Sequence, residues 1–405
     1  MATIPRTVLR IAESPRVVFL VALAIRVWVL SQLLPQKAWE YFYRYNEPSR
    51  IAWALVSGYG YSSPWPNTPQ VPTAQQPPIY PFLVAGIFKL TGAYSYRSLW
   101  IAVGLNAVLS SLTAVMILRL GKRDFGSLAG VLAAWVWACW MYEAAVAVRL
   151  WESSLSALLL LLALLMLPKL KEPSTPRWLC FGLLAAVAGL TNTSLLSVFP
   201  FFWVWLWVTY RQGGRSCRTQ LIASVGIFVL ALLPWTIRNY EVFHRLMPIR
   251  DNFGLELWIG NHEGVTDRYD TDFPILDPSE YNRLGEIRFM ESKRDIAVQF
   301  IGRGPSQFLR LSARRCLRYW TQPDPVVWFL VSLMTWIGMI LGLRRRGLRV
   351  IPYAVVPLIF PLVYYLTHTF PTYRHPTEGV MFLLAGYAVV SFAEAIARRF
   401  GHATS

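Results

Sequence analysis

The sequence predicts an all-α polytopic membrane protein with about ten transmembrane helices, and three observations support this. Of its 405 residues, 55% are hydrophobic and only 15% are charged, whereas soluble domains carry about 25% charged residues. Apolar stretches recur along the chain at close to the roughly 20 residues that a membrane helix needs. The basic residues cluster between those stretches, so the net charge of +17 indicates membrane topology rather than a nucleic-acid partner.

Ten stretches are apolar enough to be spans when the long run at 178–209 is divided at its polar sequence, Thr191-Asn192-Thr193-Ser194. The first follows three arginines and has no small-residue cleavage site, which predicts an uncleaved signal anchor. The expected spans are 17–34, 98–118, 126–142, 153–168, 178–190, 194–209, 219–235, 326–343, 350–366 and 378–396.

The basic residues between the spans favour a topology with both termini in the cytoplasm. On that topology the short outward loops at 143–152, 191–193 and 367–377 hold only two Lys or Arg residues, Arg149 and Arg374. The cytoplasmic segments hold eighteen basic residues: Arg6, Arg10, Arg16, Arg119, Lys122, Arg123, Lys169, Lys171, Arg177, Arg211, Arg215, Arg218, Arg344, Arg345, Arg346, Arg349, Arg398 and Arg399.

Two long segments then face outward, and they define the expected domain organisation. The second of them carries two amphipathic helical patterns, which Pro305 separates. The expected parts are an N-terminal transmembrane catalytic module at 1–235 that includes a first outer loop at 35–97, a periplasmic loop region with amphipathic helices at 236–325, and C-terminal transmembrane helices at 326–405.

The first outer loop holds the strongest candidate for chemistry. Glu47 precedes Ile51, Ala52, Ala54 and Leu55 at helical spacing, and a short apolar segment follows at 79–90. A carboxylate on a short helix at the edge of a membrane bundle indicates chemistry on a lipid-borne substrate. The structural alternative is that Glu47 only pairs with Arg44 or Arg50 on the helix surface.

Further polar residues gather on the outward face, where polar groups near membrane depth usually have a partner or a function. A transfer reaction on a lipid phosphate needs a carboxylate as general base and arginine for the phosphate oxygens. The candidates in the later loops are Glu143, Arg149, Glu152, Arg238, Arg374 and His375.

Several of these residues also have structural interpretations. Arg374 and His375 fit interface anchors, and Asn261-His262-Glu263 fits a surface turn better than half a metal site. The arginines at 310–318 are expected along lipid headgroups, and Arg26 inside the first span is expected to be paired or to reach the interface. None of the four cysteines has metal-like spacing, and no disulfide is expected.

Several motifs together resemble those of bacterial integral-membrane C-type glycosyltransferases, near the protein O-mannosyltransferases and aminoarabinose transferases. These are NEPSRIA with Glu47, the following GYGYSSP, PTAQQPPIYPFLVAGIFKLTG, LPWTIRNYEVFHRLMPIRDNFGLELWIGN, the Gly285-Glu286 helix and TYRHPTEGVMFLLAGYA at the last span. They cover most of the chain. Many relatives have an Asp-Glu pair where this chain has Asn46-Glu47.

The resemblance implies the C-type glycosyltransferase fold in a bacterial cytoplasmic membrane, with the active site on the periplasmic face. It implies inverting transfer from a polyprenyl-phosphate sugar to a lipid, glycan or protein acceptor. No Asp-x-Asp stands in the first loop, so no metal or other cofactor is expected. The expected roles are Glu47 as base, Glu143 or Glu152 near the catalytic centre, Arg238, Arg374 and His375 on the donor phosphate, and Arg50, Arg149, Tyr80 and Asn261 on substrate.

Two other functions remain open on the sequence. A membrane ligase or polymerase for lipid-diphosphate glycans also places arginine and histidine in outer loops, but it lacks the first-loop acid followed by PPxYP. A lipid-linked sugar transporter predicts paired charges inside spans and weak inverted repeats. Arg26 is the one basic residue within an expected span, and no repeat is visible in the sequence.

Overall fold

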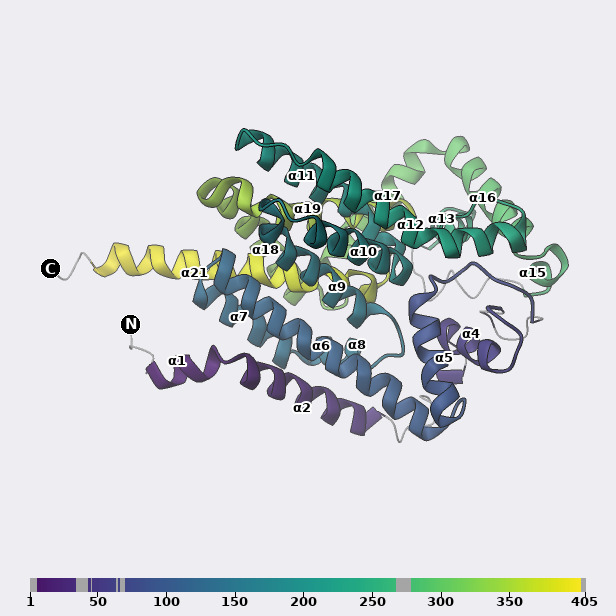
Figure 1. Cartoon of the computed structure of the whole chain (residues 1–405), viewed down its shortest axis with the longest axis horizontal. Helices are drawn as coiled ribbons and strands as arrows, with labels where there is room; N and C mark the ends of the chain where they lie inside the picture. The colour runs from purple at the N-terminus through teal and green to yellow at the C-terminus, as the bar shows by residue number, and fades with distance from the viewer. Residues whose placement is uncertain are drawn as a thin grey trace.

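The computed structural model describes residues 6–33, 43–44, 46–62, 65, 70–266 and 278–401, and helices make up this part of the chain (Figure 1). The predicted all-α class is confirmed. The helices are α1 (Arg6–Ala12), α2 (Pro15–Leu33), α4 (Glu47–Val56), α5 (Ile79–Thr91), α6 (Tyr96–Asp124), α7 (Ser127–Cys139), α8 (Met141–Ala147), α9 (Ser153–Met166), η1 (Leu167–Lys171), α10 (Thr175–Thr191), η2 (Thr193–Ser197), α11 (Phe199–Gln212), α12 (Arg218–Phe243), α13 (Phe253–Gly260), α15 (Pro278–Leu284), α16 (Glu286–Arg303), α17 (Pro305–Thr321), α18 (Pro325–Arg346), η4 (Gly347–Val350), α19 (Ile351–Ile359), α20 (Leu362–Leu366), η5 (Pro371–Arg374) and α21 (His375–Gly401).

Each of the ten expected spans lies on helix, but their lengths differ from the expectation. In the described part of the chain, 7 helical stretches are long and apolar enough to cross a membrane, or 8 if the bent pair α7 and α8 forms one span. The difference from ten arises because α10 is only 17 residues long and because α18 to α20 form one 42-residue stretch. The expected break near Thr191 is confirmed, since Asn192 ends α10 and caps η2 through Ser194 N at 3.0 Å.

Small residues bring the central helices α6, α7, α9 and α21 close together. A Cβ on Gly121 of α6 would lie 2.2 Å from the Cα of Gly130 of α7, so both positions need glycine. Arg26 of α2 is buried against the same two helices, where it donates to Ser110 Oγ of α6 at 2.8 Å and to the carbonyl of Trp137 of α7 at 3.0 Å. The expectation that Arg26 is paired within its span is therefore confirmed.

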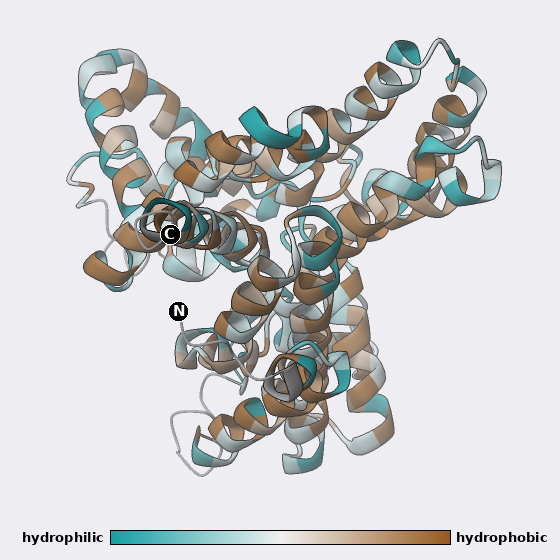
Figure 2. Cartoon of the chain, turned by 90° about the vertical axis from the view of Figure 1, so that its left-hand side faces the viewer, coloured by the Kyte–Doolittle hydropathy of each residue, from teal (hydrophilic) through white to brown (hydrophobic). Residues whose placement is uncertain are grey.

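The elements that the sequence predicts on the outer face gather at one end of the bundle. Figure 1 shows α4, α5, α13, α15 and α16 at the end opposite α1 and the C-terminal turns of α21. Figure 2 looks along the bundle from that other end and shows hydrophobic residues along the faces of its helices. The amphipathic helices expected on both sides of Pro305 are α15, α16 and α17.

One expectation for α17 is wrong. Arg315 does not lie along headgroups, because it shares the inward face of the helix with Leu311 and Tyr319 and is fully buried. Its guanidinium donates to the carbonyls of Gly260 and, at 3.1 Å, Leu366, which joins α13 to α20. The exposed arginines of this stretch, Arg310 and Arg314, remain on the outward side.

Candidate functional site

A cavity of about 530 Å³ opens among the elements predicted on the outer face. Segments far apart in the chain form its wall, namely the start of α4, the start of α9, η2, the turn before α13, α20 and η5. Its charged lining residues are Glu47, Glu152, Glu256 and Arg250, and apolar side chains such as Leu196 and Val363 complete it. Three carboxylates therefore share one cavity with one arginine.

Glu47 owes its position to the start of a short helix. Asn46 caps α4 by accepting a hydrogen bond from Ser49 N at 2.9 Å, and Pro48 follows Glu47 in the first turn. The inward face of α4, with Ile51 and Ala52, is fully buried. The predicted helix is confirmed, and its packing fixes Glu47 at the edge of the cavity.

The Glu47 carboxylate accepts hydrogen bonds from the side chains of Gln76 and Trp65, the latter at 3.3 Å. Burial raises the pKa of Glu47, while the charge of Arg250 and these hydrogen bonds oppose the rise. A carboxylate with a raised pKa is the stronger proton acceptor once it is ionised. Gln75 beside it is buried, and its amide atoms have no protein partner among the described residues, so they are available to a ligand.

Glu152 lies at the start of α9, held by a network beneath the cavity. Asn106 of α6 donates to the carbonyls of Arg149 at 2.6 Å and Trp151 at 3.2 Å, and to the hydroxyl of Tyr80 at 2.7 Å. Burial raises the pKa of Glu152 to about 7, and the charge on Glu47 acts in the same direction. Tyr80, predicted to contact substrate, is thus placed to position Glu152.

Arg250 is the cationic group of the cavity, and it was not among the residues predicted for the site. Its guanidinium lies 3.5 Å from Glu256 Oε1, and its Nε is buried without a hydrogen-bond partner in the described chain. Glu256 also lies 3.4 Å from His368 Nε2. Arg250 belongs to the same motif stretch as Arg238, but no periodic signal in the turn before α13 separates a cavity arginine from a surface one.

Arg238 lies in α12 and binds backbone carbonyls of the first loop. It donates to the carbonyls of Thr73 at 2.7 Å and Tyr61 at 2.9 Å. Its guanidinium also lies over the ring of Trp235 at 5.0 Å. Arg238 therefore fixes the part of the first loop that carries Gln75 and Gln76.

A pair of carboxyls holds the same loop from the opposite side. Glu286 of α16 accepts from Ala74 N at 2.5 Å and from the hydroxyl of Tyr281 at 2.9 Å. Asp251, next to Arg250, is its neighbour. Burial, reinforced by the charge of Asp251, raises the pKa of Glu286 to about 8, and burial raises the pKa of Asp251 to about 6. The backbone N–H of Asp251 donates to the carbonyl of Ala74 at 3.3 Å, and this bond joins the Gln76 loop to the Arg250 turn.

This pair predicts that stability falls as pH rises. Both folded pKa values lie above the unfolded ones, so the folded protein binds more protons, and the stabilisation present at about pH 4 is lost as pH rises through about 6 to 8. The loss is at most about 1.4 kcal/mol per pH unit for each proton concerned. Thermal unfolding in detergent from pH 5 to 9 measures it, and Glu286→Gln is expected to flatten the curve. An unchanged slope in that variant would contradict the assignment.

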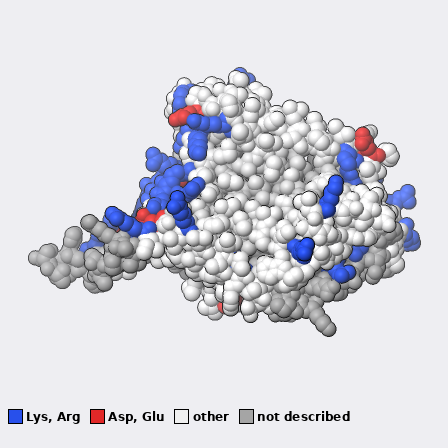
Figure 3. All heavy atoms as spheres, turned by 60° about the horizontal axis from the view of Figure 1, so that its bottom comes forward, with Lys and Arg blue, Asp and Glu red and all other residues white. Residues whose placement is uncertain are grey.

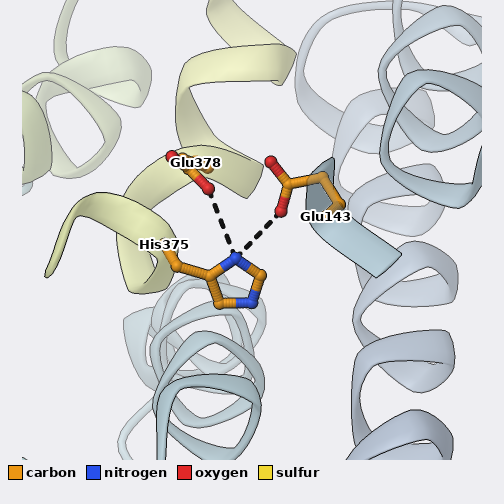
Figure 4. Close-up of side chains that lie close together, drawn as sticks. All are labelled: Glu143, His375 and Glu378. Atoms are coloured by element: carbon orange, nitrogen blue, oxygen red, sulfur yellow. Dashed lines mark ion pairs between the residues drawn. The ribbon is translucent and has the colours of Figure 1, made fainter. Parts of the chain in front are cut away.

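A second cluster lies apart from the cavity, fully buried between α8 and the start of α21 (Figure 4). His375 Nδ1 lies 2.9 Å from Glu143 Oε2 and 3.3 Å from Glu378 Oε2. Arg374 donates to Glu378 Oε1 at 2.9 Å and to the carbonyl of Gln322 at 2.8 Å, with its guanidinium 3.5 Å above the ring of Trp328. With His375 protonated, the four charged groups sum to zero.

Three residues predicted for the catalytic site therefore meet one another, but they do not line the cavity. Glu143 and Glu152 are both in the outer loop, yet Trp140 bends the chain by 61° and α8 turns Glu143 inward. Arg374 and His375 lie with Glu143. In the described chain, Glu143, His375 and Glu378 are the one group of three potential metal ligands whose atoms lie within 4.8 Å of one another.

The remaining predicted substrate residues have mixed positions. Arg50 is half-buried on α4, and Arg149 is exposed with its carbonyl bound by Asn106. Asn261 is fully buried and donates to the carbonyls of Leu257 at 2.7 Å and Leu366 at 2.9 Å, so it joins α13 to α20. The expected surface turn at 261–263 is wrong for Asn261 and His262, which are buried. All four cysteines are free, as expected.

No family model matches the chain, and no curated protein matches it. The crystal structure of the Archaeoglobus fulgidus oligosaccharyltransferase in the apo form matches with a TM-score of 0.58 and 13% identity, over 96% of this chain and 52% of that one. The Archaeoglobus fulgidus oligosaccharyltransferase AglB in complex with an inhibitory peptide and a dolichol-phosphate matches with a TM-score of 0.52 and 12% identity, over 88% and 47%.

The crystal structure of ArnT from Cupriavidus metallidurans bound to undecaprenyl phosphate also matches, with a TM-score of 0.37 and 13% identity, over 85% of this chain and 72% of that one. The chain spans about half the length of the oligosaccharyltransferase structures. At these identities the oligosaccharyltransferase matches establish the fold, and they confirm the predicted C-type glycosyltransferase architecture.

Proposed function

We propose that this protein is a membrane glycosyltransferase that moves a sugar from a polyprenyl-phosphate donor to an acceptor hydroxyl. The observation that carries the proposal is that Glu47, Glu152 and Arg250 share one outer-face cavity with apolar side chains. A carboxylate and a guanidinium are the two groups that such a transfer requires. The fold is shared with an oligosaccharyltransferase whose structure was determined with dolichol-phosphate, which supports a lipid phosphate as the donor class.

In this proposal Arg250 takes the phosphate role first assigned to Arg238, Arg374 and His375. Those three side chains are engaged elsewhere, with the first loop and with the buried cluster. Arg250 faces the cavity and has a buried Nε without a protein acceptor in the described chain. A planar guanidinium matches two phosphate oxygens at once, and it stabilises the charge on the departing lipid phosphate.

Glu47 is proposed as the general base. It takes the proton of the acceptor hydroxyl as that oxygen forms a bond to the anomeric carbon, while the bond from that carbon to the phosphate oxygen breaks. Attack from the face opposite the phosphate inverts the anomeric configuration. Glu152 lines the same cavity and is proposed to orient the acceptor.

The reaction as proposed uses no metal ion. The three cavity carboxylates share the cavity with Arg250, a cation that the chain itself supplies. Among the described residues, the one close group of potential metal ligands lies outside the cavity, in the buried cluster. The proposed setting is a bacterial cytoplasmic membrane, with the cavity on the periplasmic face and both termini in the cytoplasm. The positions of α1 and the C-terminal turns of α21, at the end opposite the cavity-lining helices α4 and α13, support this arrangement (Figure 1).

The test is sugar transfer or hydrolysis by the purified protein in detergent, with radiolabelled polyprenyl-monophosphate sugars in one arm and a polyprenyl-diphosphate glycan in the other. EDTA is added in parallel. Turnover of a monophosphate donor that is indifferent to EDTA is the expected result. Turnover of the diphosphate donor alone would indicate the ligase instead, and transport without bond cleavage would indicate a transporter.

Arg250 gives a prediction for donor binding. Arg250→Gln is expected to weaken the binding of a polyprenyl-phosphate sugar by about 10- to 150-fold, since a hydrogen bond to a charged group contributes about 1.5–3 kcal/mol. Arg250→Lys should recover part of the loss. Binding is measured by titration with a fluorescent donor analogue. Arg310→Gln, at an exposed arginine outside the cavity, is the control and should bind as the wild type does.

A further inference from the structure

A second cavity, of about 720 Å³, lies at the opposite end of the bundle, where α18 and α21 end. Its lining contains four arginines and one carboxylate, so its charge is strongly positive. Two of the arginines come from the last turn of α18, one from η4 and one from α21: Arg345, Arg346, Arg349 and Arg398, with Glu394 as the acid. Figure 3 shows Lys and Arg concentrated at the left-hand end of the molecule, next to a broad uncharged surface.

Hydrogen bonds hold two of the arginines in the wall of this cavity in place. Arg345 donates to Ser391 Oγ at 3.1 Å and so joins α18 to α21. Arg346 donates to the carbonyl of Phe125 at 3.3 Å, and its guanidinium lies 5.2 Å from the ring centre of Tyr387. Each of these contacts uses only part of a guanidinium, because arginine has five N–H donors. The remaining donors are held near one another around a common space.

The side chains near the cavity indicate which class of ligand it binds. Exposed apolar side chains stand close in sequence to the lining residues on both helices, with Ile340 five residues before Arg345 of α18 and with Val389 and Phe392 next to Val390 and Ser391 of α21. These apolar side chains suit acyl chains, whereas the arginines suit phosphate. A soluble phosphate would gain nothing from the apolar flank.

We propose that this arginine cavity binds the phosphate of an anionic membrane lipid, and that α18 and α21 together form the site. The proposal is independent of the transfer reaction at the other end of the molecule. It distinguishes these arginines from the general excess of basic residues on one side of a membrane protein. That general excess attracts anionic lipid without a fixed site, whereas the cavity arginines should retain individual lipid molecules.

The experiment is native mass spectrometry of delipidated protein in detergent, titrated with phosphatidylglycerol or with phosphatidylcholine. Arg345→Gln/Arg398→Gln removes two cavity arginines. Arg344→Gln/Arg399→Gln removes their exposed sequence neighbours, one from each of the same helix ends and neither lining the cavity. The two variants therefore have the same net charge. Thermal unfolding compares their stability with that of the wild type.

We expect the wild type to prefer phosphatidylglycerol, and the cavity variant to bind it about tenfold more weakly, while the neighbour variant binds it within about twofold of the wild type. Equal losses in the two variants, or no preference between the lipids, would overturn the proposal. Inorganic phosphate that displaces the lipid supports recognition of the phosphate group. Inorganic phosphate that binds as tightly as the lipid would overturn the assignment to lipid. Arg398→Gln alone, which leaves the Ser391 contact intact, serves if the double variant unfolds.

Discussion

Replacing Glu47 with glutamine is expected to lower the rate of sugar transfer by about 10²- to 10⁴-fold, the usual contribution of a general base. Glutamine has the same shape and still reaches the Gln76 and Trp65 side chains, so the fold and the donor affinity should be retained. The loss should therefore appear in kcat. Steady-state kinetics with a radiolabelled polyprenyl-phosphate sugar, together with donor titration, measure both quantities.

The pH profile separates a base from a residue that only shapes the cavity. Glu47 must be ionised to accept a proton, and burial raises its pKa. The rate of the wild type should therefore rise with pH through an acidic limb, and Glu47→Gln should remove that limb. Glu263→Gln, at an exposed acid outside the cavity, is the control. Wild-type rates in Glu47→Gln would transfer the role to Glu152.

Much of the fold could be predicted because the membrane imposes strong patterns on the sequence. Membrane spans can be predicted from the length of their apolar stretches. The first-loop helix at Glu47 can be predicted from apolar residues at helical spacing. The break at Asn192 was visible as a polar interruption between two apolar runs. These features are local, so a single stretch of sequence carries the whole signal.

The composition of the site could be predicted only in part, because convergence in space has no local signal. Glu47 and Glu152 were candidates and do line one cavity. Glu143, nine positions before Glu152, faces the other way because the chain bends at Trp140. Arg238 and Arg250 stand in one motif stretch, but the end of α12 at His244, with φ of 53°, reverses the chain between them. A bend and a reversal therefore decided which candidates meet.

Replacing His375 with leucine is expected to lower the free energy of unfolding by about 3–5 kcal/mol, the usual cost of leaving a buried charge without its partner. Glu143 and Glu378 would then face each other with only Arg374 to balance them. Because the packing of Trp137 on the His375 ring is also lost, at 4.9 Å between ring centres, the single variant alone does not isolate the charge. Reversible unfolding in a detergent mixture provides the free energies.

A double-mutant cycle isolates the electrostatic part. Glu143→Gln removes one negative charge with little change of shape, and the double variant removes the charge together with its partner. If His375 is the cation that balances the cluster, the double variant should be more stable than the sum of the two single losses predicts, with a coupling of about 0.5–3 kcal/mol. Additive losses would show that packing alone accounts for His375. Stoichiometric metal in the purified protein, with destabilisation by EDTA, would show that a bound cation neutralises the carboxylates instead. Each of these results would explain how the cluster stabilises the packing of α8 against the start of α21. This packing also supports the cavity, because Pro376, next to His375, lines its wall.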